Sequence, residues 1–341
     1  VAVPVQTQGG FCKVVRPVKV NLQGGYYQSD GLTEVDQGGA VNIAGTFNQD
    51  GGAVADAGAI IIYGDYGENA GTSVLQSGTV VVAGNINVGS GASLSGTGTL
   101  TTIGVYSGLP GFGGGIEEDA GNVTDQGAIT AAGDYLFKGG LLTLVYGTVN
   151  AGPVEVDPSA LLTGIGTITP DLKVNGGTVQ VGPGTLTVTG KVNVLTGSVS
   201  VPSADTLAVG GEVDQSGGTV DANGGTVVVT GAYNETGGLT TLELGTLDAN
   251  GVIVTSGGVL SGYGAVNSAV SNSGEVDADN GTLAVSGAYT QTAGVTNVGA
   301  YSSQGTVGLT AASFSEQAGN VNIDGPSQGG RAALRLSLIH I

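Results

Sequence analysis

Apolar residues alternate with polar or small residues in short bursts along the chain, and many bursts meet a glycine at a fixed position. In each copy, apolar residues stand four and two positions before the glycine, and an apolar or aromatic residue stands two positions after it. Alternation with a period of two is typical of a half-buried strand, and the glycine indicates a bend or bulge. Since no comparable 3.6-residue stripe occurs, the pattern predicts strands and few helices.

The glycines that share this position mark a repeat. They are Gly45, Gly64, Gly84, Gly133, Gly190, Gly211, Gly231, Gly251 and Gly287, which we interpret as structural turn glycines. Most neighbouring anchors are 19 to 21 residues apart, and the wider gaps of 49, 57 and 36 residues are near two or three such steps. The stretches 219–238 and 275–294 show the unit most clearly, because they are nearly the same line. The chain is therefore a repeat with a unit of about 20 residues.

A unit of this length holds two or three short strands and cannot bury its own apolar face. Stacked units can, because each coil pairs its strands with those of the next at roughly 4.8 Å, and inward residues then form continuous ladders. Asn, Asp, Ser and Gly between the bursts supply the corners. The pattern predicts an all-β fold, a parallel β-solenoid, with about fifteen coils between Gly25 and Gly325.

Three phrases carry a resemblance to a known group of proteins. They are "LSGTGTL" at 94–100, "LSGYGAVNSAVSNSGEV" at 260–276 and "GAYTQTAG" at 287–294. Together with the coil length, they resemble β-helical passenger regions of bacterial autotransporters and filamentous-haemagglutinin-like adhesins, over roughly residues 25–325. The resemblance implies a single-stranded, right-handed parallel β-helix that is extracellular or on the bacterial cell surface. It also implies an outer-membrane translocator barrel, which we expect to be missing from this fragment.

The repeat suggests three parts of unequal length. We interpret residues 1–21 as an N-terminal cap or the tail of an upstream element, and residues 22–330 as the solenoid. Residues 331–341 are expected to be a disordered tail. The last six, 336–341, resemble the translation of a sequencing adapter, which suggests a metagenomic fragment.

The repeat breaks at two places inside the solenoid. Near 101–127 it gives way to an irregular insertion, and solenoid insertions emerge as loops that often carry function. Near 146–171 it is interrupted by three prolines, which mark corners or edges because proline cannot donate to an interior ladder. We interpret this second stretch as a variable coil rather than a domain boundary.

Composition excludes several classes of partner. The chain has 27 acidic and eight basic residues and a net charge of −19, so its field repels nucleic acid and anionic headgroups. No run of 18 apolar residues occurs, so no direct membrane insertion is expected. Cys12 is the single cysteine, which excludes a disulfide framework and a CxxC site.

Acidic residues in the insertion form the candidate cation loop. Glu117, Glu118 and Asp119 are adjacent, and calcium prefers such oxygen ligands. A run of three charges is also typical of a solvated loop, and the calcium-binding nonapeptide of RTX proteins is absent. No other cofactor is expected.

An enzyme would need carboxylates close together, or a carboxylate beside a base. Asp214 with Asp221, or Asp248 with Asp277 and Asp279, would supply them if whole coils brought them to one face. Turn chemistry alone also places Asp at corners. His340, the only histidine, lies in the adapter-like stretch, and the chain has no Trp to stack against sugars. The sequence therefore predicts no catalytic residues and no enzyme.

The aromatic residues beside the anchors have two interpretations. They are Phe47, Tyr66, Tyr135, Tyr233 and Tyr289. Their constant register favours a buried stack over a carbohydrate-stacking strip. The predicted function is a non-catalytic passenger or adhesin stalk whose loops contact a host or neighbouring-cell surface, including its glycans. The alternatives are a β-helical polysaccharide lyase or hydrolase, and a pure spacer of a larger secreted protein.

Overall fold

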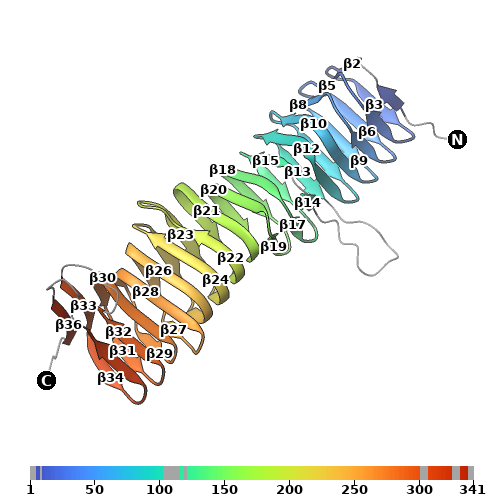
Figure 1. Ribbon diagram of the computed structural model, residues 1–341. Coiled ribbons are helices and arrows are strands. Elements are labelled where there is room, and N and C mark those ends of the chain that lie inside the picture. The colour runs from blue at the N-terminus through green and yellow to red at the C-terminus, as the bar shows by residue number, and fades with distance from the viewer. Residues whose placement is uncertain are drawn as a thin grey trace. The chain divides into compact units, whose positions relative to one another are not determined.

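The computed structural model describes residues 5–7, 10–102, 116–118, 121–299, 306–324 and 331–336. Within these ranges the regular structure is all strand, and the strands form two compact units, Val1–Pro170 and Asp171–Ile341 (Figure 1). The prediction of an all-β parallel β-solenoid is confirmed, with about 14 turns roughly 20 residues apart. Its right-handed sense stays a prediction.

The first unit contains strands β1 to β20. Their bounds are β1 (Val5–Thr7), β2 (Phe11–Val14), β3 (Lys19–Leu22), β4 (Tyr26–Gln28), β5 (Leu32–Val35), β6 (Ala40–Ile43), β7 (Phe47–Gln49), β8 (Ala53–Asp56), β9 (Ala59–Ile62), β10 (Tyr66–Leu75), β11 (Thr79–Val82), β12 (Ile86–Gly96), β13 (Thr99–Thr102), β14 (Ile116–Glu118), β15 (Asn122–Asp125), β16 (Ala128–Thr130), β17 (Tyr135–Phe137), β18 (Gly140–Asn150), β19 (Val154–Val156) and β20 (Ala160–Thr169).

The second unit contains strands β21 to β36. Their bounds are β21 (Leu172–Val188), β22 (Val192–Ser200), β23 (Thr206–Val209), β24 (Val213–Asn223), β25 (Thr226–Val229), β26 (Tyr233–Ala249), β27 (Val252–Val254), β28 (Gly258–Val266), β29 (Val270–Asn272), β30 (Glu275–Val285), β31 (Ala288–Gln291), β32 (Val295–Val298), β33 (Thr306–Ala311), β34 (Ser313–Glu316), β35 (Asn320–Ile323) and β36 (Arg331–Leu336).

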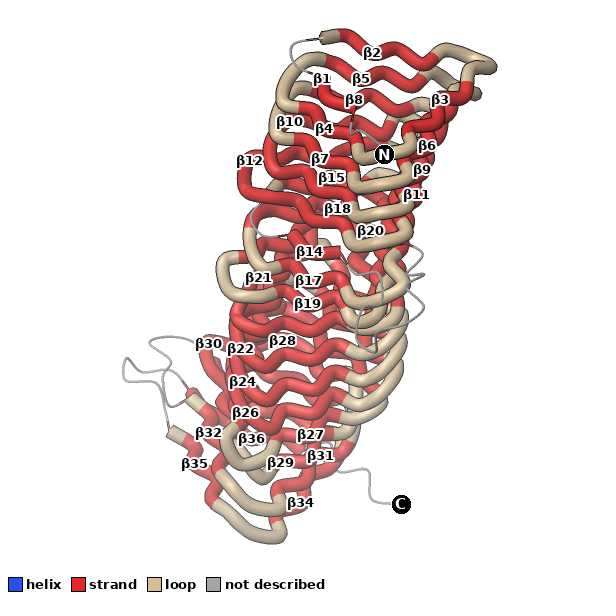
Figure 2. Tube along the Cα trace, turned by 90° about the vertical axis from the view of Figure 1, so that its right-hand side faces the viewer, coloured by secondary structure: helices blue, strands red, loops and turns tan. Residues whose placement is uncertain are grey.

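Each coil has three extended runs, and each run pairs in parallel with the same run of the next coil. In the first unit β4 pairs with β7, β5 with β8 and β6 with β9. We call these runs wall A, wall B and wall C, in chain order. A long strand such as β10 or β24 turns the corner between walls A and B without a break. Figure 2 shows equivalent strands of successive coils lying side by side within each unit.

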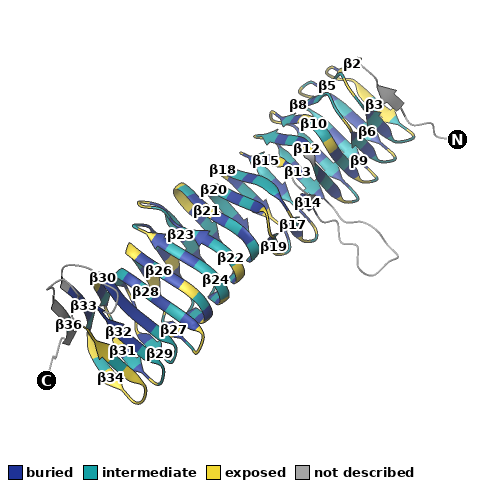
Figure 3. Ribbon diagram, viewed as in Figure 1, coloured by how far each residue is buried: buried dark blue, intermediate teal, exposed yellow. Residues whose placement is uncertain are grey.

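The core of each unit is the inside of its coils. In wall C of the first unit, Ile43, Ile62 and Val82 are register neighbours, and each has no exposed surface. Burial alternates along most strands between inward and outward residues (Figure 3). Burying one such side chain contributes about 1.5–3 kcal/mol, so the stacked ladders supply most of the stability.

The anchor glycines lie at the corner between wall C and the following wall A. None of the nine has a positive φ, so they are not needed for left-handed backbone. Six of them are needed because successive corners approach closely. A Cβ on Gly45 would lie 2.8 Å from the backbone nitrogen of Gly25, and one on Gly231 would lie 2.8 Å from the carbonyl oxygen of Gly211. Gly64, Gly84, Gly211 and Gly287 are equally crowded, whereas Gly251 has open space around it.

The solenoid extends further than the sequence suggested. Residues 1–21 were predicted to be a cap or tail, but β2 and β3 pair in parallel with β5 and β6 and form two walls of a coil. Residues 331–341 were predicted to be a disordered tail, but β36 pairs with β33. Both segments lie beyond the outermost anchor glycines, so the repeat gave no signal there.

The two predicted irregularities are described to different extents. In the first, Thr102 ends β13, Ile116 begins β14, and residues from 121 onwards resume the coil, so the described residues at both ends of 101–127 belong to regular coils. Residues 103–115 lie outside the described residues. The stretch 146–171 also forms regular coils, with its prolines outside the strands, as predicted for corners. The boundary between the units falls at Pro170/Asp171, where the sequence predicted a variable coil rather than a boundary.

Candidate functional site

A row of polar side chains lies inside the solenoid, on wall A, two residues after the first inward residue of that wall. We call it the inner polar row. Its members are Gln28, Gln49, Glu68 and Glu118 in the first unit, and Gln215, Glu235, Asn272 and Gln291 in the second; all have no exposed surface. Gln28, Gln49 and Glu68 are neighbours in three successive coils. Buried polar groups at this density require hydrogen-bond partners.

The partners include a hydroxyl pair that recurs with the same spacing. A tyrosine on wall A and a Ser or Thr seven residues later on wall B share a hydrogen bond. The pairs are Tyr26 with Thr33 (2.6 Å), Tyr66 with Ser73 (3.0 Å), Tyr233 with Thr240 (2.8 Å) and Tyr289 with Thr296 (2.6 Å). The Ser or Thr then donates to a glutamine Oε1, as Thr240 does to Gln215 at 2.9 Å. The corner between walls A and B is therefore held by side chains.

Each glutamine of the row donates its amide to backbone carbonyls of two coils. Gln28 Nε2 donates to Gly31 O at 3.2 Å in its own coil and to Ala53 O at 2.9 Å in the next. Gln215 and Gln291 donate in the same way. These amides join one coil to the next beside the backbone bonds, such as that from Ala53 N to Gly31 O, so their role is structural.

The glutamates of the row have one bonded and one unbonded oxygen. Tyr66 donates to Glu68 Oε2 and Tyr135 donates to Glu118 Oε2, both at 3.0 Å. Glu235 Oε1 accepts from the backbone N–H groups of Thr240 and Val259 at 3.1 Å each. The remaining oxygens, Glu68 Oε1, Glu118 Oε1 and Glu235 Oε2, have no partner.

Burial raises the pKa values of these carboxyl groups. The pKa rises from an ordinary 4.5 to about 7 for Glu68, about 9 for Glu118 and about 8 for Glu235. In each case desolvation is the largest cause, and hydrogen bonds to the carboxylate oppose it.

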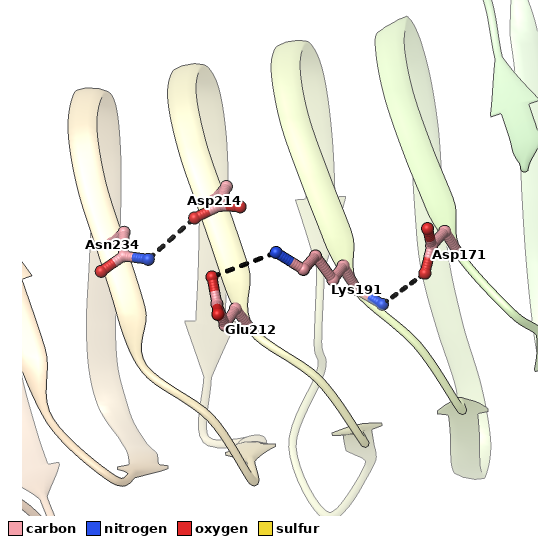
Figure 4. Close-up of polar contacts among 5 residues, drawn as sticks. All are labelled: Asp171, Lys191, Glu212, Asp214 and Asn234. Carbon is pink, nitrogen blue, oxygen red and sulfur yellow. Dashed lines mark hydrogen bonds and ion pairs between the residues drawn. The ribbon is translucent and has the colours of Figure 1, made fainter.

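Polar side chains on the outer surface of the second unit also connect successive coils (Figure 4). The backbone nitrogen of Lys191 donates to Asp171 Oδ1 at 2.8 Å, and Lys191 Nζ lies 3.3 Å from Glu212 Oε2. On the adjoining wall A, Asn234 Nδ2 donates to Asp214 Oδ1 at 2.8 Å. Because these side chains bond to one another across coils, they support the stacking.

Three of the acids that an enzyme could have used, Asp214, Asp221 and Asp248, fall on different walls. Asp214 is on wall A between Asn193 and Asn234, and Asp221 is on wall B between Ser200 and Thr241. Asp248 is on wall C, beside Val228. None of these acids is a register neighbour of another, so the structure does not bring them together.

One acidic group does form, on β30. Asn297 Nδ2 donates to Asp277 Oδ1 at 2.7 Å and to Glu275 Oε1 at 3.0 Å. Asp279 lies near, and both Asp277 and Asp279 are 7% exposed. Burial, together with the charges of Glu275 and Asp279, raises the pKa of Asp277 to about 6, against the bond from Asn297. Across the described residues, no group of three or more His, Cys, Asp or Glu has the arrangement of a metal site.

One of the three acids predicted for the candidate cation loop, Glu118, does not lie in a loop. Glu118 was predicted to lie in an exposed loop, but it is an inward residue of β14 and has no exposed surface. Its carboxyl accepts a hydrogen bond from the Tyr135 hydroxyl inside the coil, so it does not point outward to join a cation site with Glu117 and Asp119. The side chain of Glu117 and the whole of Asp119 lie outside the described residues.

The aromatic residues are buried, as the sequence predicted, but they stack only in places. Tyr26, Phe47 and Tyr66 stack in succession with ring centroids 5.1 Å apart, and Tyr289 stacks on Phe314 at 5.3 Å. Tyr135 and Tyr233, at no more than 1% exposure, lie between aliphatic register neighbours instead. Sequence reasoning missed the polar row beside them. Its signal was the spacing Tyr, then Gln or Glu two residues later, then Ser or Thr five residues after that, as in 26–33, 66–73, 233–240 and 289–296.

An apolar cavity of about 200 Å³ lies inside the first coils of the first unit. Val14, Leu22, Ile43 and Phe47 contribute to its lining. The hydroxyls of Tyr26 and Thr33, which also line it, bond to each other at 2.6 Å. The lining is otherwise apolar apart from the thiol of Cys12, so it offers mainly packing surface.

No protein-family model matches the chain, and no curated protein sequence matches it. The described part of the chain also contains no helix with the length and apolar character needed to cross a membrane.

Proposed function

We propose that the chain is the non-catalytic solenoid of a surface-exposed or secreted bacterial passenger or adhesin stalk. A parallel β-solenoid of about 14 turns is compatible with that role. The resemblance of its repeat phrases to autotransporter and haemagglutinin-like passengers supports the assignment. Its location would be extracellular or at the cell surface, and its partners a host or neighbouring-cell surface and the glycans there.

The observation that carries this proposal is the closure of the interior. The tyrosine hydroxyls and carboxyl groups that would do acid–base chemistry face inward and bond to one another, as Tyr66, Glu68 and Ser73 do. Outward acids such as Asp214 and Asp221 are spread over separate walls. A fold that uses its reactive groups to hold coils together fits a scaffold better than an enzyme.

The contact region we propose is the insertion between β13 and β14. In the preceding coil three residues, 83–85, separate β11 from β12, whereas thirteen residues, 103–115, separate β13 from β14 in the chain. A long connection on a rigid scaffold is a common place for binding, because it changes without disturbing the pairing.

The insertion can be removed without cutting a strand. A variant in which residues 103–115 are replaced by Ala-Gly-Asn, the sequence of 83–85, keeps both β13 and β14. We expect wild type to bind cells or a glycan array and the variant to lose that binding with an unchanged melting temperature. Binding retained by the variant would exclude the insertion as the contact. Absence of binding by both proteins would favour the pure spacer.

A β-helical polysaccharide lyase or hydrolase is the second candidate, and the acidic group on β30 is the observation that favours it. A carboxyl with a pKa near 6, as at Asp277, is suited to proton transfer at neutral pH. Incubation with acidic and neutral polysaccharides tests this. New reducing or unsaturated ends that Asp277→Asn abolishes would contradict the non-catalytic proposal.

A further inference from the structure

Glutamate takes the place of glutamine at corresponding positions of the inner polar row. Glu68 is the register neighbour of Gln49, and Glu235 is the register neighbour of Gln215. Glu118 lies between Val88 and Phe137 in the same row. The glutamines bond through both ends, with Oε1 accepting from a hydroxyl and Nε2 donating to carbonyls. An ionised glutamate has no donor to match the second end.

Among the residues that the structure describes, no positive charge acts on the pKa values of these carboxyl groups. Glu235 is surrounded by Tyr233 on its own strand, Gln215 and Val254 on the adjacent coils, and Thr240 on wall B. In the described part of the chain the titratable group that faces it is Tyr233, whose own pKa is raised by burial and raised further by the charge of an ionised Glu235. No lysine or arginine is among the groups that shift the pKa of Glu235.

The sites of Glu68 and Glu118, both in the first unit, resemble that of Glu235. Glu68 lies beside Tyr66, Ser73 and Gln49, and the charge of Asp56 adds to the rise in the pKa of Tyr66. Glu118 lies beside Tyr135, whose pKa the charge of Asp125 also raises. The titratable neighbours within the described residues are therefore acids and tyrosines. A buried carboxylate among such neighbours is strongly disfavoured, because it has neither water nor a cation to solvate its charge, whereas the neutral acid avoids that cost.

We propose that Glu68, Glu118 and Glu235 are held as neutral acids that replace glutamine in the inner polar row. They make the solenoid most stable in acid and loosen their coils when the surroundings become alkaline. The raised pKa values of about 7, 9 and 8 agree with this geometry.

The sign follows from proton binding in the two states. Above the ordinary pKa of 4.5 the unfolded chain has lost these protons, whereas the folded chain keeps them up to about pH 7 to 9. Folding therefore takes up protons in that window, and stability falls as pH rises through it. Each group raises the unfolding equilibrium constant about tenfold per pH unit until its folded pKa is passed. Below pH 4.5 the effect disappears.

Comparison of wild type with E68Q/E118Q/E235Q separates this effect from that of the general negative charge. Urea unfolding is measured from pH 4 to 9.5, with E243Q as the matched control, because Glu243 is exposed on the same strand as Glu235. We expect the ratio of wild-type to triple-variant unfolding constants to rise by up to about 10³ per pH unit above pH 4.5, and E243Q to follow wild type. Equal pH dependence in wild type and the triple variant would overturn the proposal.

Two measurements keep the test valid if the triple variant does not fold. Infrared difference spectra of wild type at pH 6 are expected to show the carbonyl band of buried, protonated carboxylic acids, which shifts on deuteration. In the single variant E235Q, the amides of Thr240 and Val259, which bond to Glu235, are expected to exchange at least tenfold more slowly than in wild type at pH 8 and equally at pH 4.5. Absence of the infrared band, or equal exchange at both pH values, would contradict neutral glutamates.

Discussion

Wall C and the corner between walls A and B are built from the same repeat but pack differently inside. Wall C carries ladders of Val, Ile and Leu, such as Ile43 on Ile62, which have no polar atoms to satisfy. The corner instead holds tyrosine, glutamine or glutamate, and threonine in closed hydrogen-bonded groups. An apolar ladder tolerates small shifts of one coil over the next. A polar group bonds in a single register, so we infer that wall C supplies stability and the corner fixes alignment.

Truncation in wall C has the largest expected effect. Ile62→Ala removes a fully buried side chain that lies between its register neighbours Ile43 and Val82. It should lower the free energy of unfolding by about 2–5 kcal/mol, as cavities in rigid cores do. Tyr63→Ala is the control, because the adjacent Tyr63 is 60% exposed and should change stability by less than about 0.5 kcal/mol. Equal losses in a urea titration would refute the assignment of stability to wall C.

Glu235→Gln should stabilise the protein, in contrast to most core substitutions. At pH 8 about half of the wild-type folded molecules still hold a proton that the unfolded state has lost, because burial raises the pKa of Glu235 to about 8. The gain should be about 4 kcal/mol at pH 8 and should vanish at pH 4. Thermal melts at the two pH values measure it, and a gain that persisted at pH 4 would indicate better packing rather than proton linkage.

Removal of one hydroxyl from the corner tests alignment. Tyr233→Phe leaves Gln215 and Thr240 bonded to each other but takes away both tyrosine bonds, at 2.7 and 2.8 Å. The expected loss is about 1–2 kcal/mol. Tyr146→Phe, at a tyrosine that is 81% exposed, is the control and should have no effect. A chemical denaturation series decides the matter, and a neutral Tyr233→Phe would mean that the hydroxyl is dispensable.

The outer contacts should matter least. Lys191→Met removes the ion pair with Glu212, whose partners are 47% and 44% exposed. Solvent screening limits such a pair to at most about 1 kcal/mol, and salt should reduce it further. The measurement is urea unfolding in low and high salt. A loss of unfolding free energy above about 1 kcal/mol that salt does not reduce would show that the outer contacts stabilise the protein more than we infer.

The sequence by itself determined the strands, the coil length and the parallel stacking. Period-two alternation and spacing along one chain are local properties, and a unit of about 20 residues has no means of burying its apolar face except against its own copies. The same reasoning placed Phe47, Tyr66 and Tyr289 in a buried stack and the prolines at corners. It overlooked the strands that lie outside the anchors, β2, β3 and β36, because the glycine signal was absent there.

Only the tertiary structure decided which polar residues are buried. Alternation does not distinguish an inward Glu118 from one in a loop, and it does not reveal that a residue seven positions after a tyrosine returns to meet its hydroxyl. That meeting depends on the angle of the corner and on the register of the neighbouring coil. The inner polar row, its neutral glutamates and the acidic group on β30 are therefore properties of stacked coils, because each needs partners that the chain supplies from another turn.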